Sequence, residues 1–447
     1  MPAADPDSRC AARSRASLFS LLLAAASPLI ALALIHRLWI RRKGLIGLAA
    51  KFSGEPGPVR TGSIIVHGVS LGEVNLMRPL VPKLESAFGA PCLLTTTTET
   101  GWQRLGEVFP NHDRAMLPFD LPWAVERFLS RTRPRAVVLL ELEVWPQLLL
   151  ACQRRGIPVA LVNARVSARS YAGYRRAGAL LRPVFASFAV ALAQNAIWGA
   201  RLRGLGARHV VVSGSMKADM VRPADPDAAS ALAAGFGLDQ RPTLLLASTS
   251  PDEEKTVLSA ANQVQHWLQR GWRIVICPRH PERGPVLVDL VRELGANAKR
   301  TSNGESLATA DDLLIVDQIG KLAGLYAWCA RTGGIAIVGG SLGSDRGGQN
   351  MLEPAAAGAC TVVGPDTRNF PDAMALLREA GGVIELGKDA ATWQAALRDL
   401  AGDDARRLAV GAGGVAAWRA GLGATERVVD KLGQNLSACR TPPGRRP

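Results

Sequence analysis

One glutamate lies in a turn where α/β proteins place their ligands. The stretch HGVSLGE, His67–Glu73, separates the apolar run Ile64–Val66 from a segment whose apolar residues recur at helical spacing. This order predicts a buried strand followed by a helix, and ligands bind at the carboxyl ends of parallel strands. Glu73 is therefore a candidate ligand contact. Acids are also common at helix N-termini because the helix dipole favours them, so both interpretations stay open.

Two further carboxylates end another hydrophobic run. Glu141 and Glu143, in AVVLLELEVWP, are two residues apart, which predicts that they share one side of a strand. Burying unpaired acids is costly, so we expect one of them to face a ligand cleft. Lys217, in GSMKAD, directly follows another predicted strand. The arginine-rich stretch 165–176 is interpreted instead as an ordinary solvated face.

The second half of the chain has a candidate anion site. Arg279 directly follows the apolar run of RIVICPRH, and an arginine at a strand end can hold a phosphate through two hydrogen bonds. A solvated surface charge is an equally good interpretation of this arginine.

A glycine-rich loop, VGGSLGSDRGGQN, leads into a predicted helix that starts near Asn350. The N–H groups at such a start attract phosphate, and asparagine is a favourable N-cap. Glu353, three residues later, is either part of a capping box or a carboxylate that accepts the hydroxyls of a ribose. No GxxxxGK[ST] motif is present, so ATP hydrolysis is not indicated.

The elements that must position these residues alternate regularly. Six short apolar runs in each half of the chain are followed by helical or loop segments, which predicts two parallel sheets covered by helices. We expect an α/β protein of two doubly wound, Rossmann-like domains, residues 44–220 and 243–435, with a ligand cleft between them. Residues 221–242, rich in Pro, Asp, Ala and Gly, are the predicted linker, and residues 436–447 a disordered tail.

The N-terminal segment, residues 1–43, is predicted to be a membrane anchor. Residues 16–35 carry no charge, and at about 1.5 Å per residue they just cross a hydrocarbon core of about 30 Å. The basic cluster within residues 37–43 keeps the following domain in the cytoplasm. No small-residue cleavage site precedes that cluster, which disfavours a signal peptide. The serines and Pro28 leave open whether the segment spans the membrane or lies on it.

The net charge of +15 predicts an acidic partner, which could be a phosphorylated substrate, an anionic membrane surface or nucleic acid. Only three tyrosines are available for base stacking, which weakens the nucleic-acid interpretation. The seven cysteines form no CxxC pair and the six histidines have no ligand spacing. We therefore expect a reducing compartment and no metal site.

Together these stretches resemble the 3-deoxy-D-manno-octulosonic acid (Kdo) transferase family of lipid A biosynthesis. The resemblance runs from about Leu38 to Val428. It rests on an ordered set of motifs: HGVSLGE, TTTTETG, PFDLPWAVERFL, ELEVWP, NARVSARS, GSMKAD, PRHPER, GGSL, GGQNMLEPAAAG and GPDTRNFPD. The hydrophobic N-terminus, ending in HRLWIRRKG, is also similar to the anchor of that family. Each motif is short, but their order and spacing are specific.

The resemblance implies a GT-B glycosyltransferase in which two domains face a central cleft. The N-terminal domain would bind the acceptor, a lipid A precursor (lipid IVA), and the C-terminal domain the CMP of the donor, CMP-Kdo. The enzyme would lie at the cell inner membrane, with its catalytic domains on the cytoplasmic side and its basic surface toward anionic lipid. The resemblance implies no cofactor, no metal and no nucleic-acid partner.

The resemblance also implies roles for individual residues. Glu73 would be the general base, and Glu141 and Lys217 would stabilise the transition state. CMP would be held by Pro278, Arg279, Ile319, Gly320, Lys321, Asn350, Met351, Leu352 and Glu353. The chain departs from the family at Lys321, where an acid is usual, so a side-chain contact would be lost there while backbone contacts would survive. A positioned base is what an acceptor hydroxyl needs, and burial raises the pKa of a glutamate toward a useful range.

Three alternatives belong to other functional classes or use other donors. The first is a GT-B transferase that uses a UDP-sugar. The second is a protein of the same fold that does not transfer sugars, either a sugar-nucleotide epimerase or a binding protein. The third is nucleic-acid binding through the positive charge, which would be strongly salt-dependent.

Overall fold

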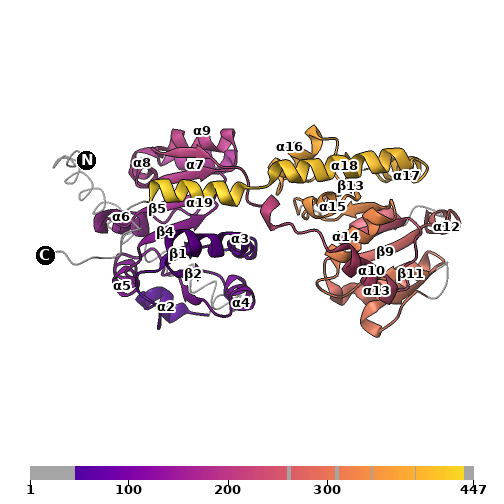
Figure 1. Ribbon diagram of the computed structural model, residues 1–447, viewed down its shortest axis with the longest axis horizontal. Coiled ribbons are helices and arrows are strands. Elements are labelled where there is room, and N and C mark those ends of the chain that lie inside the picture. The colour runs from indigo at the N-terminus through magenta and orange to yellow at the C-terminus, as the bar shows by residue number, and fades with distance from the viewer. Residues whose placement is uncertain (1–45, 259–262, 308–311, 344–345, 388, 437–447) are drawn as a thin grey trace. The chain divides into compact units, whose positions relative to one another are not determined.

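Two compact units make up the chain. The structure, a computed structural model, describes residues 46–258, 263–307, 312–343, 346–387 and 389–436 (Figure 1). The first unit comprises the chain up to Met220 and again from Gly423 onward. The second unit comprises Val221–Leu422. Each unit has its own parallel sheet and its own hydrophobic core, so each is described by itself.

The first unit is built on a seven-stranded parallel sheet of order β3-β2-β1-β4-β5-β6-β7. Its strands are β1 (Ile64–His67), β2 (Cys92–Thr96), β3 (Asp113–Met116), β4 (Ala136–Leu140), β5 (Val159–Ala164), β6 (Val190–Ala193) and β7 (Val210–Val212). The central strands are buried along their whole length, as expected for apolar runs covered on both faces. The strand order reverses between β1 and β4, and α/β sheets bind ligands at such a switch point.

Helices cover both faces of this sheet. Helices α3 (Leu71–Phe88), α4 (Glu99–Val108) and α19 (Ala424–Asn435) pack on the face that includes Ile64 and Val66. The face of Ile65 is covered by α5 (Pro122–Thr132), α6 (Pro146–Arg155), α8 (Gly178–Ala186) and α9 (Ala196–Leu205). The unit also contains α2 (Leu48–Ser53), α7 (Ala168–Arg176) and the 3-10 turn η1 (Ala218–Met220). The doubly wound prediction is confirmed for this unit.

The second unit repeats this design with a sheet of order β10-β11-β9-β8-β12-β13-β14, again parallel. Its strands are β8 (Thr243–Thr249), β9 (Arg273–Pro278), β10 (Asn297–Arg300), β11 (Asp312–Ile315), β12 (Ile335–Val338), β13 (Cys360–Val363) and β14 (Ile384–Glu385). Here the order reverses between β8 and β12, so the segments that follow these two strands border the switch point.

Helices again lie on both faces. One core is formed with α11 (Pro251–Leu258), α12 (Gln263–Gln269), α13 (Gly284–Glu293), α17 (Ala390–Ala401) and α18 (Asp404–Gly421). The other is formed with α10 (Pro226–Gly235) and α14 (Leu322–Arg331). The remaining elements are η2 (Pro281–Arg283), η3 (Thr301–Asn303), α15 (Leu352–Ala357) and α16 (Pro371–Glu379).

Two boundaries differ from the predicted ones. Residues 221–242 are not an open linker, because α10 within them packs against α14 and contributes to the core of the second unit. Residues 424–435 form α19, which packs on α3 of the first unit rather than on the second. Asp219 fixes this return, since its carboxylate accepts the backbone N–H groups of Gly423 and Thr425.

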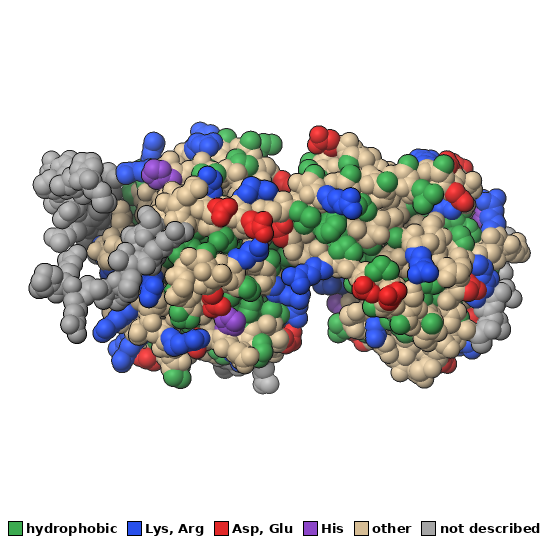
Figure 2. All heavy atoms as spheres, viewed as in Figure 1, with side chains coloured by type: hydrophobic (Ala, Val, Ile, Leu, Met, Phe, Trp, Pro, Cys, Tyr) green, Lys and Arg blue, Asp and Glu red, His purple; other side chains and the backbone are tan. Residues whose placement is uncertain are grey.

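The predicted anchor, residues 1–43, and nearly all of the predicted tail lie outside the described residues. Among the residues that are described, no helix is long and apolar enough to cross a membrane. Figure 2 shows lysine and arginine side chains at many separate places on the visible face, interspersed with acids. The positive charge on that face is therefore dispersed rather than gathered into one stripe.

Candidate active site

The turn after β1 places Glu73 in the first turn of α3. Ser70 is the N-cap, and its hydroxyl oxygen accepts the N–H of Glu73 at 3.2 Å. The Glu73 side chain reaches back: Oε2 accepts the N–H of Val69 at 2.7 Å, and Oε1 accepts the hydroxyl of Ser70 at 2.8 Å. The interpretation of Glu73 as an acid that stabilises a helix N-terminus is therefore confirmed. It does not exclude a catalytic role, because a carboxylate oxygen can accept more than one hydrogen bond.

Gly68 lets this acid lie close above the strand end. A Cβ at Gly68 would stand 2.9 Å from Cβ of Glu73 and equally close to Met77, so a side chain there would push α3 away. Thr96, at the end of β2, and Thr98, the N-cap of α4, both donate hydroxyl hydrogen bonds to the carbonyl of Val69. The turn is thus held by the segment that joins β2 to α4.

The loop after β4 brings two more acids to the same edge. Because β4 ends at Leu140, Glu141 and Glu143 lie beyond the strand, and the predicted two-residue alternation does not apply to them. Glu141 has φ of 57°, a left-handed conformation that is costly for a residue with a Cβ and that often marks functional sites. Its N–H is held by the carbonyl of Val162 at 3.0 Å.

Glu73, Glu141 and Glu143 form what we call the acid cluster, at the switch point between β1 and β4. Burial raises the pKa of Glu73, which is 8% exposed, and the charge of Glu141 raises it further, against the lowering effect of the bonds from Val69 and Ser70. Burial and then the charge of Glu73 raise the pKa of Glu143 to about 7. Like charges at short range oppose joint ionisation, so Glu73 and Glu143 do not ionise independently of one another.

Lys217 follows β7 on the same sheet edge and is half-buried. The N–H of the preceding Met216 donates to Oδ1 of Asn163 at 3.0 Å, which ties this segment to the end of β5. Asn163 is fully buried and also adopts a left-handed conformation, with φ of 52°. The strand order thus brings Glu73, Glu141 and Lys217 to one edge. The arginines of α7, such as Arg169 and Arg176, are exposed, as a solvated face would be.

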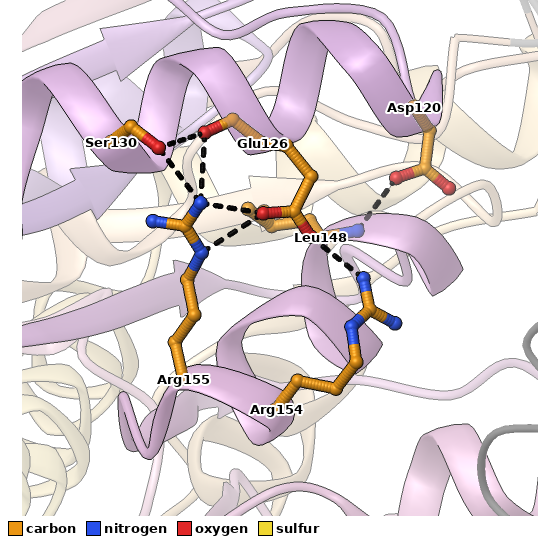
Figure 3. A network of polar contacts seen from close by, with 6 residues as sticks. All are labelled: Asp120, Glu126, Ser130, Leu148, Arg154 and Arg155. Atoms are coloured by element: carbon orange, nitrogen blue, oxygen red, sulfur yellow. Dashed lines mark hydrogen bonds and ion pairs between the residues drawn. The ribbon is translucent and has the colours of Figure 1, made fainter.

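A polar network holds the far end of the loop between β4 and α6, which carries Glu141 and Glu143 and which we call the acid loop. The loop runs into α6, whose first N–H groups, on Gln147 and Leu148, donate to the carboxylate of Asp120 at 2.9 Å each. Burial raises the pKa of Asp120 to about 6. Figure 3 shows the bond from Leu148 to Asp120 beside the ion pairs that join Glu126 of α5 to two arginines of α6. Helix α6 is therefore anchored where the acid loop ends.

Sequence reasoning singled out Glu141 over Glu143 and gave no role to Trp145, His67 or Asn163. Trp145 donates its indole N–H to Glu143 at 2.8 Å, and His67 lies fully buried beneath it. A polar residue at the end of a predicted strand was the available signal for both His67 and Asn163. Their burial, and the left-handed backbone of Asn163, could be seen only in the structure.

In the second unit, Arg279 stands at the carboxyl edge of the sheet. Its N–H donates to the carbonyl of Thr249 at the end of β8, its side chain is exposed, and the preceding Pro278 is buried. The charge of Arg279 lowers the pKa of Glu353, which burial raises. The structure thus brings together two of the predicted donor-binding residues.

Glu353 belongs to an arrangement different from the predicted helix cap. Helix α15 begins at Leu352 and its N-cap is Met351, so Asn350 lies one residue before the cap. The prediction that Asn350 is the N-cap is therefore wrong. Instead, Nδ2 of Asn350 donates to Oε1 of Glu353 at 3.0 Å, and Oδ1 of Asn350 accepts the N–H of Leu352 at 3.3 Å. Met351 and Leu352 are buried, backbone included, so neither residue presents an exposed group to a ligand.

The segment before α14, residues 319–321, is largely exposed to solvent. Ile319 is 89% exposed, Gly320 has φ of 85°, and Lys321 is the N-cap of α14 without a side-chain capping bond. Lys321 is partly exposed. The backbone groups of this segment are accessible whatever side chain stands at Lys321.

Glu253 organises the glycine loop after β12. Its buried carboxylate accepts four hydrogen bonds, from the N–H and hydroxyl of Ser250 and from the N–H groups of Gly340 and Leu342. Ser248 approaches the loop closely: a Cβ at Gly339 would stand 2.3 Å from its carbonyl oxygen. The start of the loop, residues 339–342, is therefore tied to the segment that follows β8 at the second switch point. The described residues contain no group of acidic, histidine or cysteine side chains arranged to hold a metal.

Comparison with known proteins places these features in a family. Residues 40–220 match the family model described as 3-deoxy-D-manno-octulosonic-acid transferase (kdotransferase). The chain is 37% identical to 3-deoxy-D-manno-octulosonic acid transferase of Bordetella pertussis, over 84% of this chain and 88% of the relative. It is 30% identical to the enzyme of the same name from Haemophilus influenzae, over 83% and 86% of the two chains.

Solved structures agree on the fold. The S. aureus MnaA-UDP co-structure aligns with 87% of this chain and all of that chain, with a TM-score of 0.56 and 14% identity. MurG of Acinetobacter baumannii aligns with 84% of this chain and 99% of that chain, with a TM-score of 0.50 and 13% identity. At these identities the likeness concerns the fold alone, two Rossmann-like units as in GT-B structures. The sequence relatives decide the family: the chain belongs to the 3-deoxy-D-manno-octulosonic acid transferases and is a glycosyltransferase.

Proposed function

We propose that this chain transfers Kdo from CMP-Kdo to a hydroxyl of a lipid A precursor, with inversion at the anomeric carbon. The observation that carries the proposal is the acid cluster at the switch point of the first unit, in a chain of this family. Glu73 is the general base. Burial raises its pKa, so it binds a proton more readily than an exposed carboxylate does, while its two hydrogen bonds keep the ionised form populated.

The reaction is a single displacement. As the acceptor oxygen attacks the anomeric carbon of Kdo, its proton moves to Glu73 and the bond to the CMP phosphate breaks. Positive charge develops on the sugar ring in such a transfer, and the carboxylate of Glu141 is suited to stabilise it. Lys217 is suited to the negative charge that develops on the leaving phosphate. Both residues stand on the sheet edge that bears Glu73.

The second unit binds CMP. Arg279 supplies an exposed guanidinium for the phosphate, and the carboxylate of Glu353, oriented by Asn350, accepts the ribose hydroxyls. The backbone groups around Ile319, Gly320 and Lys321 contact the nucleotide, so the lysine in place of the family acid leaves these contacts intact. Pro278, Met351 and Leu352 are buried, so they shape the site by packing behind it.

The acceptor and the location are part of the same proposal. A phosphorylated, acylated acceptor accounts for both the net charge of +15 and the charge-free run at residues 16–35. We place the protein at the inner membrane, with both units on the cytoplasmic side.

Mass spectrometry tests this function directly. Full-length protein in detergent is incubated with a tetra-acylated, bis-phosphorylated lipid A precursor and freshly made CMP-Kdo, and the expected result is a mass increase of one or more Kdo residues. Parallel reactions contain UDP-sugars in place of CMP-Kdo. Transfer from a UDP-sugar, or epimerisation of one, with no reaction of CMP-Kdo would contradict the proposal.

A further inference from the structure

Glu143 is the member of the acid cluster to which the reaction above gives no role. It is partly buried in the loop between β4 and α6. Its Oε2 accepts the indole N–H of Trp145 at 2.8 Å, while Oε1 has no hydrogen-bond partner in the described part of the chain. One oxygen is therefore held and the other is available.

Trp145 is itself fixed from below. Its ring stands edge-on to the ring of His67, with 6.0 Å between the centroids. His67 is fully buried, and its Nδ1 lies 3.0 Å from the hydroxyl of Thr95 on the neighbouring strand. Because burial lowers the pKa of His67 to about 3, this ring is neutral at physiological pH. The ring beside Trp145 therefore does not change its charge in the physiological pH range.

The charged groups that shift the pKa of Glu143 are both acids. Glu73 comes from α3 and Glu141 from the same loop, and the charge of each raises the pKa of Glu143. Tyr174 comes from α7, and its pKa is raised by burial and by the charge of Glu143. None of these groups favours an ionised Glu143.

The hydrogen bonds decide which acid ionises first. Glu73 accepts two hydrogen bonds, from Val69 and Ser70, which stabilise its carboxylate, whereas Glu143 accepts one. Interacting carboxyls lose their protons in sequence rather than together. Glu73 is therefore ionised over a pH range in which Glu143 still holds its proton.

We propose that Glu143 binds the acceptor as a neutral acid: while Glu73 is ionised, Oε1 of Glu143 carries a proton and donates a hydrogen bond to an oxygen of the acceptor. This inference rests on the proposed function, since it takes Glu73 as the base. Two carboxyls in one site, one neutral and one ionised, can donate and accept side by side. Loss of the Glu143 proton removes the donor and adds a negative charge next to a phosphorylated acceptor.

The consequence is an alkaline limb in the pH profile of transfer. A group with a pKa of about 7 is about 90% protonated at pH 6 and only about 3% protonated at pH 8.5, so kcat/KM for the acceptor should fall about thirty-fold between them. Glu143→Gln cannot ionise and keeps an N–H donor. In that variant the ratio of kcat/KM at pH 8.5 to that at pH 6 should rise about ten-fold or more over the wild-type ratio. This ratio cancels any loss common to both pH values.

Two other variants separate this role from a structural one. Glu143→Ala has no donor, so its kcat/KM at pH 6 should lie at least about ten-fold below that of Glu143→Gln. Glu107→Gln removes an exposed carboxyl of α4 that pairs with Arg104, and should keep the wild-type ratio. A wild-type alkaline limb in Glu143→Gln, or equal activity of Glu143→Gln and Glu143→Ala at pH 6, would overturn the inference.

A second readout does not depend on the donor sugar. The indole ¹⁵N–¹H signal of Trp145, assigned by its loss in Trp145→Phe, should titrate near pH 7 in the unliganded protein and stay constant in Glu143→Gln. A constant signal in the wild type would overturn the neutral-acid assignment even if Kdo is transferred. If instead the signal titrates but CMP-Kdo is not used, the proposed function fails while the protonation of Glu143 stands.

Discussion

Glu73 accepts two hydrogen bonds that hold the start of α3, and the same two bonds keep its carboxylate ionisable in a buried place. Helix capping and base catalysis are therefore compatible in this residue. The sequence placed Glu73 in a strand-to-helix turn and Arg279 at a strand end, and both positions are confirmed. It did not reveal the left-handed backbone of Glu141, whose N–H is held by Val162, because that contact joins residues distant in the chain. It did not reveal the bond between Trp145 and Glu143 either, because a spacing of two residues does not fix how the two side chains turn.

Replacing Glu73 by glutamine tests the base. Glutamine keeps the size of the side chain but cannot accept the proton, so we expect kcat to fall by about 10²–10⁴-fold. The melting temperature should change little and CMP affinity not at all. In the wild type, the base must be ionised, so kcat/KM should fall as the pH falls through the pKa of Glu73. Because burial raises that pKa, this acid limb should lie above the usual carboxylate range near 4.3.

Near-normal transfer by Glu73→Gln would end the catalytic interpretation. So would a loss of folding that accounts for the whole loss of activity. Turnover, melting temperature and CMP affinity are therefore measured on the same preparation.

The donor site has its own test in the CMP dissociation constant, measured by calorimetry. Arg279→Ala removes a charge-assisted hydrogen bond worth roughly 1.5–3 kcal/mol, which weakens CMP about ten- to a hundred-fold. Glu353→Ala should also weaken CMP, because it removes the acceptor for the ribose. Arg292→Ala, which removes an exposed arginine of α13, is the matched control and should bind CMP normally.

A lower melting temperature with unchanged CMP affinity in Glu353→Ala would show that this carboxylate serves only the local fold through Asn350. Unchanged affinity in Arg279→Ala would remove this residue from the donor site.

Strands that are buried on both faces could be predicted from their sequence, whereas polar edge strands could not. The runs IIVH, AVVLL and TLLLAST correspond to β1, β4 and β8. In contrast, β3 (sequence DRAM) and β10 (sequence NAKR) were not predicted, because each stands at a sheet edge and lacks an apolar run. The absence of these two edge strands from the prediction does not affect the candidate sites, since both switch points lie between central strands.

Helix α6 offers a test of how an element positions the acid cluster. Asp120 caps its first N–H groups, and Asp120→Ala should lower the free energy of unfolding by about 0.5–2 kcal/mol. It should also lower kcat, because the acid loop ends where α6 begins. Asp225→Ala is the matched control: Asp225 caps α10 through the N–H groups of Asp227 and Ala228. It should cost similar stability and leave kcat unchanged. Equal kcat in both variants would show that the cap of α6 does not position the loop.

At the scale of the whole molecule, the chain passes from one unit to the other twice, after Met220 and after Leu422. The second crossing could not be predicted from local pattern. Helix α19 is amphipathic, and such a helix fits any sheet face that lacks cover. Contacts with distant residues decide its place: Asp219 caps its start, Lys83 pairs with Glu426, and Arg427 donates to the carbonyl of Ser213.

Because α19 completes the core of the first unit, a substitution that weakens its packing should destabilise the first unit and not the second. Leu432 is fully buried in that core, so Leu432→Ala should destabilise the first unit by about 2–5 kcal/mol. Hydrogen exchange measures this by element: amides of β1 and β4 should exchange faster, while those of β8 and β12 keep their protection. Leu408→Ala, on the exposed side of α18, is the control and should change neither set. Faster exchange in β8 and β12 in Leu432→Ala would mean that α19 stabilises the second unit, and that the chain does not return to complete the first.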